Sequence, residues 1–157
     1  MDAPEASAVN EIIEILIGVD PGFETVEEHP EISDLKGSLA ALCLDDSDTP
    51  VAVILLDFPA AVALGSKLMM MPDGQVDEQI AEGQAQEIVL EAASEVCNNL
   101  TVPINQVERN PHIRTLPIES AEALMSGQAA FMAAPGARDD YVGTISGTAT
   151  RISIIRA

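Results

Sequence analysis

The stretch Glu91-Ala-Ala-Ser-Glu-Val-Cys-Asn-Asn-Leu100 is the most informative part of this sequence. Apolar residues recur in it every three or four positions, which is the spacing of an amphipathic helix. Placing the residues about 100° apart around a helix axis gathers the apolar ones into one stripe. The members of that stripe are Ile88, Val89, Ala92, Ala93, Val96, Cys97 and Leu100. The sequence therefore predicts a long helix, from Val76 or Ala81 to Leu100, with this stripe in the core.

The opposite face of the same helix is polar. Glu87, Glu91, Glu95 and Asn98 follow one another at spacings of four, four and three residues, so they are neighbours on the helix surface. Each like-charge pair at this spacing costs roughly 0.2–0.5 kcal/mol, which an ordinary solvated helix face tolerates. The pattern alone therefore leaves open both a solvated face and a binding surface. Asn99 lies about 100° further round, toward the apolar edge, and is expected to act only on stability.

Two apolar runs before this helix predict a β-hairpin. Leu39–Leu44 and Val51–Leu56 are joined by the turn-rich segment Asp45-Asp-Ser-Asp-Thr-Pro50. The second run is almost continuously apolar, which indicates a central strand covered on both faces.

Two further helices are predicted on the N-terminal side. One covers residues 10–17 and ends at Gly18, and the other covers residues 58–71 and begins after Asp57, a suitable capping residue. Met69–Met71 at the end of the second helix form either part of the core or an adaptable binding surface. Core filling is the more common use of such methionines.

The remaining segments predict strands and complete the fold class. Prolines make Val102–Ile118 an irregular or edge segment, and Thr25–Ile32 reads as a short edge strand. We expect closing strands at Ala129–Ala134, Val142–Thr148 and Thr150–Arg156, with Pro135–Asp140 as the turn between the first two. No repeat or long linker divides the chain, so the prediction is a single domain over residues 1–157, with residues 1–8 a frayed lead. Its class is α+β, a mostly antiparallel sheet covered by two or three helices.

The composition excludes several classes of partner. The 157 residues include 26 Asp and Glu but only 7 Lys and Arg, which gives a net charge of −19, and aromatic residues make up only 3%. Such a surface repels nucleic acid and anionic lipid, so we expect neither as a partner. The acidic N-terminus lacks a signal-peptide pattern and no apolar run approaches the roughly 20 residues of a membrane span, so a cytoplasmic protein is expected. Cys43 and Cys97 lie in apolar segments and read as small core residues.

The helix and its surroundings resemble a known family. Glu91–Leu100 resembles the signature helix of the CheC–CheX–FliY chemotaxis phosphatases, which carry a Glu-x-x-Asn pair on an exposed helix, here Glu95-Val-Cys-Asn98. The apolar strand, the helix entered through Asp57-Phe-Pro-Ala60, and the glycine-rich strand Val142-Gly-Thr-Ile-Ser-Gly147 are similar in order too. CheC and FliY carry two such pairs, whereas this chain has one, which favours the CheX subgroup.

The resemblance implies a function. The family hydrolyses the phospho-aspartate of a CheY-like response-regulator receiver domain. On this reading Asn98 orients the attacking water, Glu95 contacts the receiver lysine, and Glu91 and Glu87 help to bind the partner. The protein then has no cofactor of its own, because the receiver supplies the magnesium ion. A homodimer is among the assemblies that the resemblance allows.

Two other functions remain open at this point. The first is a non-catalytic CheX-like protein that binds a receiver or a flagellar-switch component, which the charge of −19 favours because receiver phosphorylation sites are themselves acidic. The second is a sensory domain with a ligand beneath the Met-rich helix. His29 and His112 are far apart in sequence and are expected on the surface.

Overall fold

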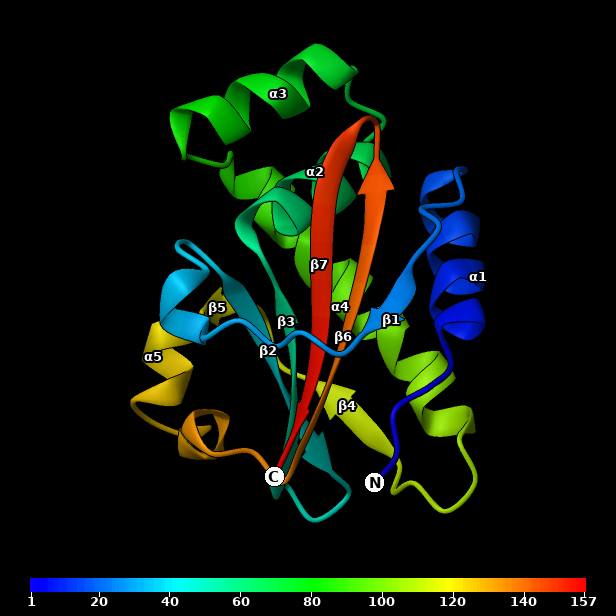
Figure 1. Cartoon of the computed structure of the whole chain (residues 1–157), viewed down its shortest axis with the longest axis vertical. Coiled ribbons are helices and arrows are strands. Elements are labelled where there is room, and N and C mark those ends of the chain that lie inside the picture. The colour runs from blue at the N-terminus through cyan, green and yellow to red at the C-terminus, as the bar shows by residue number, and fades with distance from the viewer.

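The computed structural model describes residues 1–157 as an α+β fold (Figure 1). The α-helices are α1 (Ala6–Ile17), α2 (Phe58–Leu68), α3 (Asp73–Glu82), α4 (Glu87–Gln106) and α5 (Ala121–Met125). The strands are β1 (Glu24–Val26), β2 (Leu39–Asp45), β3 (Pro50–Leu56), β4 (Ile113–Thr115), β5 (Glu119–Ser120), β6 (Ala137–Ile145) and β7 (Thr148–Arg156). Two 3-10 turns lie at Ile32–Asp34 and Ala130–Ala133.

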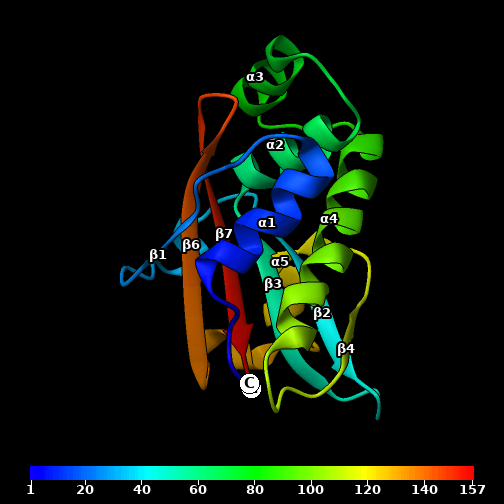
Figure 2. The ribbon, with the colours of Figure 1, turned by 90° about the vertical axis from the view of Figure 1, so that its right-hand side faces the viewer.

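All strands form one antiparallel sheet in the order β1-β6-β7-β3-β2-β4, with β5 also paired to β2. Helices α1, α2 and α4 lie on one face of the sheet, and α3 lies beyond one end of it (Figures 1 and 2). The predicted fold class is therefore confirmed, with more helices than the expected two or three.

The central strand β3 contributes to a core on each face of the sheet. Ala52, Ile54 and Leu56 belong to the core under α1, α2 and α4, whereas Val53 and Leu55 belong to a smaller core with α5. Side chains alternate between the two faces of a strand, so a continuously apolar run fills both cores. The predicted hairpin of β2 and β3 and its covered central strand are confirmed.

The N-terminal lead is held in place. The Tyr141 hydroxyl donates a hydrogen bond to the carbonyl of Pro4 at 2.7 Å, and Asn110 exchanges two hydrogen bonds with the backbone of Asp2. Helix α1 already begins at Ala6 and ends at Gly18, as its left-handed backbone (φ 78°) shows. The expectation that residues 1–8 are frayed is therefore wrong.

The single long helix predicted from residue 76 or 81 to 100 is also wrong. Gly83 adopts φ 68° and ends α3, so α4 starts only at Glu87. Helix α2 begins after Asp57 as predicted, because that carboxylate accepts a hydrogen bond from the Ala60 amide at 2.8 Å. It ends at Leu68. Met69 is 41% exposed and Met70 90% exposed, so the core-filling interpretation is wrong for these two, whereas Met71 is half-buried.

Helix α4 continues through Pro103 to Gln106, beyond the expected end at Leu100. Proline has no amide hydrogen and normally interrupts a helix. Here Pro103 is buried, and the Asn105 carboxamide two residues later exchanges two hydrogen bonds with the backbone of Ile113, at 2.9 and 3.1 Å. Tertiary contacts with β4 therefore hold the last turn, and the edge-segment prediction holds only for the part of Val102–Ile118 after the helix.

The C-terminal strands differ from the expected ones. Ala129–Ala134 contains a 3-10 turn and no strand, and most of Pro135–Asp140 belongs to β6. The hairpin turn lies instead at Ser146-Gly147, where both residues have positive φ and Ile145 pairs with Thr148. Two central residues with positive φ are typical of the tight turn that matches strand twist.

Cys43 and Cys97 are free and buried, as predicted. Burial raises the pKa of the Cys43 thiol to about 12 and raises the pKa of Cys97 as well, so both side chains behave as small apolar groups. None of the helices combines the length and the apolar character that crossing a membrane requires.

Candidate functional site

Helix α4 is held against α2 by a close approach of the two backbones. A Cβ atom on Gly65 of α2 would come within 2.2 Å of the Val89 carbonyl oxygen of α4, so only glycine fits there. Helix α1 and strand β4 contact α4 further along its length. These contacts fix the helix that carries the predicted site.

The inner face of α4 is buried as the sequence indicates. Val89, Val96, Cys97 and Leu100 are all at most 2% exposed. Ile88 is the exception in the predicted stripe, because it is 46% exposed in the first turn of the helix. The prediction of burial is therefore wrong for Ile88 and right for the rest of the stripe.

The outer face of α4 places all four predicted site residues in solvent. Glu87, Glu91, Glu95 and Asn98 are exposed along one side of the helix, the first three forming what we call the acidic ridge. Glu95 and Asn98 are three residues apart and so are surface neighbours. The structure thus brings together the candidate pair and the two glutamates expected beside it.

Asn99 contacts Glu95 directly. Its side-chain amide donates one hydrogen bond to the Glu95 carbonyl oxygen at 2.9 Å and one to the Glu95 carboxylate at 3.3 Å. The sequence predicts that Asn99 acts only on stability, and the structure adds a contact with the site, because an i,i+4 pair meets on the helix surface even when one member leans toward the apolar edge.

Strand β4 supplies a residue of the site that the sequence did not indicate. The Thr115 hydroxyl donates a hydrogen bond to the Asn98 side-chain oxygen at 3.4 Å. The Thr101 hydroxyl donates another to the Asn98 backbone carbonyl at 2.6 Å. Thr115 restricts rotation of the Asn98 carboxamide and leaves its NH2 group without a protein partner. No local pattern identifies Thr115, because it reaches the helix only through the pairing of β4 with β2.

The charges of the acidic ridge are all negative and are not paired within the chain. None of Glu87, Glu91 and Glu95 takes part in an ion pair, and α4 contains no Lys or Arg. A cation that pairs with these glutamates therefore has to come from a partner. A partner that meets the ridge therefore binds better if it carries Lys or Arg at that place.

No group of three or more His, Cys, Asp and Glu side chains is arranged to hold a metal ion. His29 and His112 are both exposed and separate, as predicted. His29 lies 3.6 Å from the Asp140 carboxylate, and His112 lies 3.1 Å from that of Asp46.

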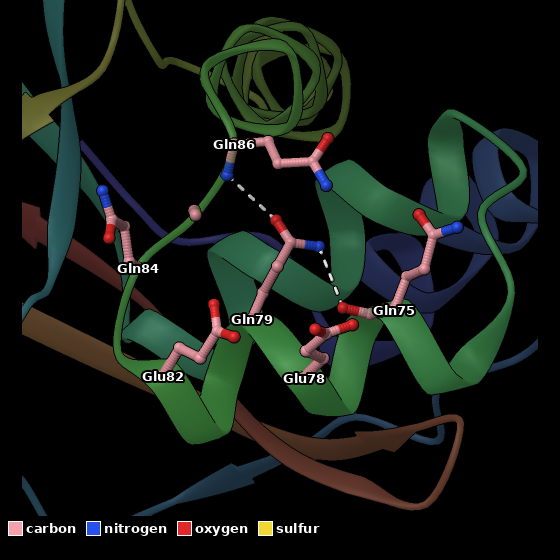
Figure 3. Close-up of a pocket in the computed structure, with 7 residues that line it drawn as sticks. Gln75, Glu78, Gln79, Glu82, Gln84 and Gln86 are labelled. Atoms are coloured by element: carbon pink, nitrogen blue, oxygen red, sulfur yellow. Dashed lines mark hydrogen bonds between the residues drawn. The ribbon is translucent and has the colours of Figure 1, made fainter.

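A polar groove of about 420 Å³ lies between α3 and the start of α4 (Figure 3). Gln79 in its wall is only 5% exposed and accepts a hydrogen bond from the Gln86 amide at 3.0 Å. Its own amide group donates to the Gln75 carbonyl at 3.1 Å and to the Ser66 hydroxyl of α2 at 3.2 Å. Gln79 therefore links α2, α3 and the first turn of α4, and every one of these bonds serves to position helices.

The fold is shared with solved structures, although no protein-family model and no curated protein matches the sequence. The chain is similar to FliY of Thermotoga maritima, with a TM-score of 0.59 and 15% identity over 96% of this chain and 83% of that one. It is similar to the structure of a CheX–CheY–BeF3–Mg complex from Borrelia burgdorferi, with a TM-score of 0.51 and 13% identity over 96% and 94%. It is also similar to the FliM middle domain from H. pylori, with a TM-score of 0.50 and 8% identity over 96% and 84%.

The class of fold follows from these neighbours. The chain has the antiparallel sheet and helix arrangement of FliY, CheX and the FliM middle domain. The expectation of a CheC/CheX-like fold is therefore confirmed.

Proposed function

We propose that this chain is a CheX-like member of the CheC–CheX–FliY family and hydrolyses the phospho-aspartate of a CheY-like receiver domain. One observation carries the proposal: Glu95 and Asn98 stand exposed side by side on α4 while the inner face of the same helix is buried. The similarity of the fold to a CheX that was solved with CheY supports the choice of partner.

Asn98 acts on the attacking water. Phosphoryl transfer asks mainly for positioning and charge stabilisation, so one well-placed side chain is a sufficient contribution. A carboxamide donates to and accepts from water and brings no negative charge toward the phosphoryl group. Thr115 holds the Asn98 oxygen at 3.4 Å, which reduces the number of orientations in which the carboxamide meets the water.

Glu95 acts on the partner before the chemical step. Its carboxylate forms a charge-assisted hydrogen bond with the receiver lysine and so sets the register of the complex. The hydrogen bond that the Asn99 side-chain amide donates to it at 3.3 Å holds that carboxylate close to the surface of α4. Glu91 and Glu87 extend the same negative surface for two more turns, and they contribute to binding rather than to the rate.

Magnesium belongs to the receiver in this proposal. A receiver phosphorylation site carries the phospho-aspartate, a lysine and the metal ion that neutralises the phosphoryl oxygens. This chain then contributes only Asn98 and Glu95 to the assembled site.

The second candidate function is binding without hydrolysis. The unpaired charges of the acidic ridge favour it, because a receiver phosphorylation site is itself acidic and like charges oppose close approach. Such a protein would bind a receiver or a flagellar-switch component and hydrolyse nothing.

The rate of phosphate loss from a receiver tests the proposal. CheY-like receivers of the source organism are phosphorylated with acetyl phosphate and Mg²⁺, and their dephosphorylation is followed with and without this chain. Acceleration well above the receiver's own rate is expected with at least one receiver. Binding to a receiver without any acceleration would replace the phosphatase by the second candidate.

A further inference from the structure

Helices α1 and α4 form an apolar groove on the surface beside the candidate site. The two helices lie side by side on one face of the sheet (Figure 2). The groove has a volume of about 160 Å³. The residues that line it are Ala8, Glu11, Ile12, Ile15, Val102, Pro103 and Gln106. We call it the α1–α4 groove.

Two large apolar side chains of this groove, Ile15 and Val102, are open to solvent. Ile15 is 71% exposed and Val102 is 42% exposed, whereas Val9 and Ile13 on the inner side of α1 are at most 1% exposed. On α1 the exposed apolar residue of the groove is therefore Ile15, whereas Ile12 beside it packs partly on the core. Single exposed apolar residues are ordinary, but neighbours that share one groove mark an interaction surface.

The α1–α4 groove lies about one helical turn from the Glu95–Asn98 pair. Val102 lies four residues after Asn98, which is about one turn and about 6 Å along the helix axis. A protein that covers Asn98 closely enough to place a phosphoryl group there is within reach of Val102 and Ile15.

The charges of α1 and α4 indicate which kind of partner fits the α1–α4 groove. Helices α1 and α4 together carry Glu11, Glu14, Glu87, Glu91 and Glu95 but neither Lys nor Arg. A second copy of this chain would bring the same negative charges to the interface, which opposes self-association there. The fitting occupant has an apolar side chain flanked by basic residues.

We propose that the α1–α4 groove is a second contact for the receiver and receives an apolar side chain from a basic segment of it. This inference rests on the proposed function and extends it. Glu95 and Asn98 meet the phosphorylation site, while the groove determines affinity and the choice of receiver.

Binding measurements on groove variants test this proposal. The chain is titrated calorimetrically with CheY-like receivers held in the phosphorylated form by beryllofluoride and Mg²⁺. Ile15→Ser is expected to weaken binding about tenfold, because it removes a large apolar contact. Val102→Thr should weaken it about threefold, because it replaces one methyl group by a hydroxyl of nearly the same shape. Met70→Ser is the matched control, since Met70 is 90% exposed and lies outside the groove. Unchanged melting temperatures show that each variant is folded.

The outcomes separate this inference from the proposed function. Weaker binding by Ile15→Ser with an unchanged dephosphorylation rate at saturating receiver supports a docking groove. Wild-type binding by Ile15→Ser, with turnover intact, overturns the groove and leaves the phosphatase. Failure of the wild type to bind any receiver overturns both. A wild-type dimer in sedimentation that Ile15→Ser dissociates assigns the groove to a second copy and also overturns the inference.

Discussion

The outer face of α4 and the sheet region of β6 and β7 both carry clustered charges, but they differ in how those charges are paired. Asp140 on β6 is fully buried and accepts hydrogen bonds from Arg138 at 2.8 and 2.9 Å and from Arg151 at 2.5 Å. Neighbouring Asp139 is paired with Arg156. The acidic ridge on α4 has no cation at all.

The pairing on β6 and β7 has a structural use. Arg138 also donates to the carbonyl of Pro30 at 2.8 Å, and Arg151 to that of Glu28 at 3.1 Å. The two arginines therefore fasten the loop after β1 to the sheet through one buried carboxylate. Burial alone would raise the pKa of Asp140, but the hydrogen bonds and charge of the arginines outweigh it and hold that pKa below its usual value.

The difference shows which charges the fold needs. Three of the 7 cationic residues of the chain are committed to Asp139 and Asp140, and none is placed near the acidic ridge. The ridge adds repulsion, and its one internal side-chain contact is the exposed hydrogen bond from Asn99 to Glu95, so it contributes little to the stability of the folded chain. Its charges are available to a partner.

Removing the buried carboxylate is expected to have the largest effect. Asp140→Ala leaves the charges of Arg138 and Arg151 partly buried without a partner, and breaking such a network costs about 3–5 kcal/mol. Urea unfolding at pH 7 should show this loss in the free energy of unfolding. Glu91→Ala on the acidic ridge is the matched control and should change stability by less than about 0.5 kcal/mol. Equal losses in both variants would remove the distinction between the two regions.

Acid should act on the Asp140 network in a defined range of pH. Because the pKa of Asp140 is lower in the folded chain than in the unfolded chain, its contribution to stability is complete above the unfolded pKa of about 4 and is lost as the pH falls through the folded value. Asp140→Asn keeps the shape but cannot titrate. The difference in unfolding free energy between wild type and Asp140→Asn should therefore be constant from roughly pH 5 to 7, where the carboxylate is ionised in both states. It should shrink below about pH 4. A difference that grows toward low pH would contradict the depressed pKa.

The elements that were predicted correctly are those whose signals are local. The apolar runs of β2 and β3, the capping carboxylate of Asp57 and the 3.6-residue period of α4 each depend on a few adjacent residues. The same period also separated Glu95 and Asn98 from Val96 and Cys97 correctly.

Several of the errors arose where contacts between residues far apart in the sequence determine the structure. Asp139 and Asp140 have the composition of a turn, but arginines of β7 pair with them and make them part of a strand. Pro103 lies within a helix because Asn105 is fastened to Ile113. The contact of Thr115 with Asn98 likewise depends on sheet pairing that no short pattern reveals.

Reversing one charge of the acidic ridge tests its role in binding. Glu95→Lys should weaken binding to the beryllofluoride-activated receiver about tenfold, because a repulsive pair with the receiver lysine replaces an attractive one. Glu87→Lys, two turns away, should have a smaller effect. Tighter binding by Glu95→Lys would show that the ridge meets an acidic part of the receiver, as the non-catalytic reading supposes.

Replacing Asn99 should have the smallest effect, and that effect should be confined to KM. Asn99→Ala frees the Glu95 carboxylate from a solvent-exposed hydrogen bond worth about 0.5 kcal/mol, so KM for the phosphorylated receiver should rise about twofold. The value of kcat should stay unchanged, because in the proposed complex Glu95 contacts the receiver before the transition state. A fall in kcat without a change in KM would place Glu95 in the chemical step.

The dephosphorylation rate with Asn98→Ala tests the central claim most directly. The phosphorylated receiver is mixed with saturating wild type or variant in the presence of Mg²⁺, and its binding is measured in parallel with beryllofluoride. Asn98→Ala should lose about 99% of the acceleration while its Kd changes less than about threefold, because the carboxamide orients water mainly in the transition state. A variant that binds and dephosphorylates like the wild type would contradict the assignment of Asn98 as the water-orienting residue.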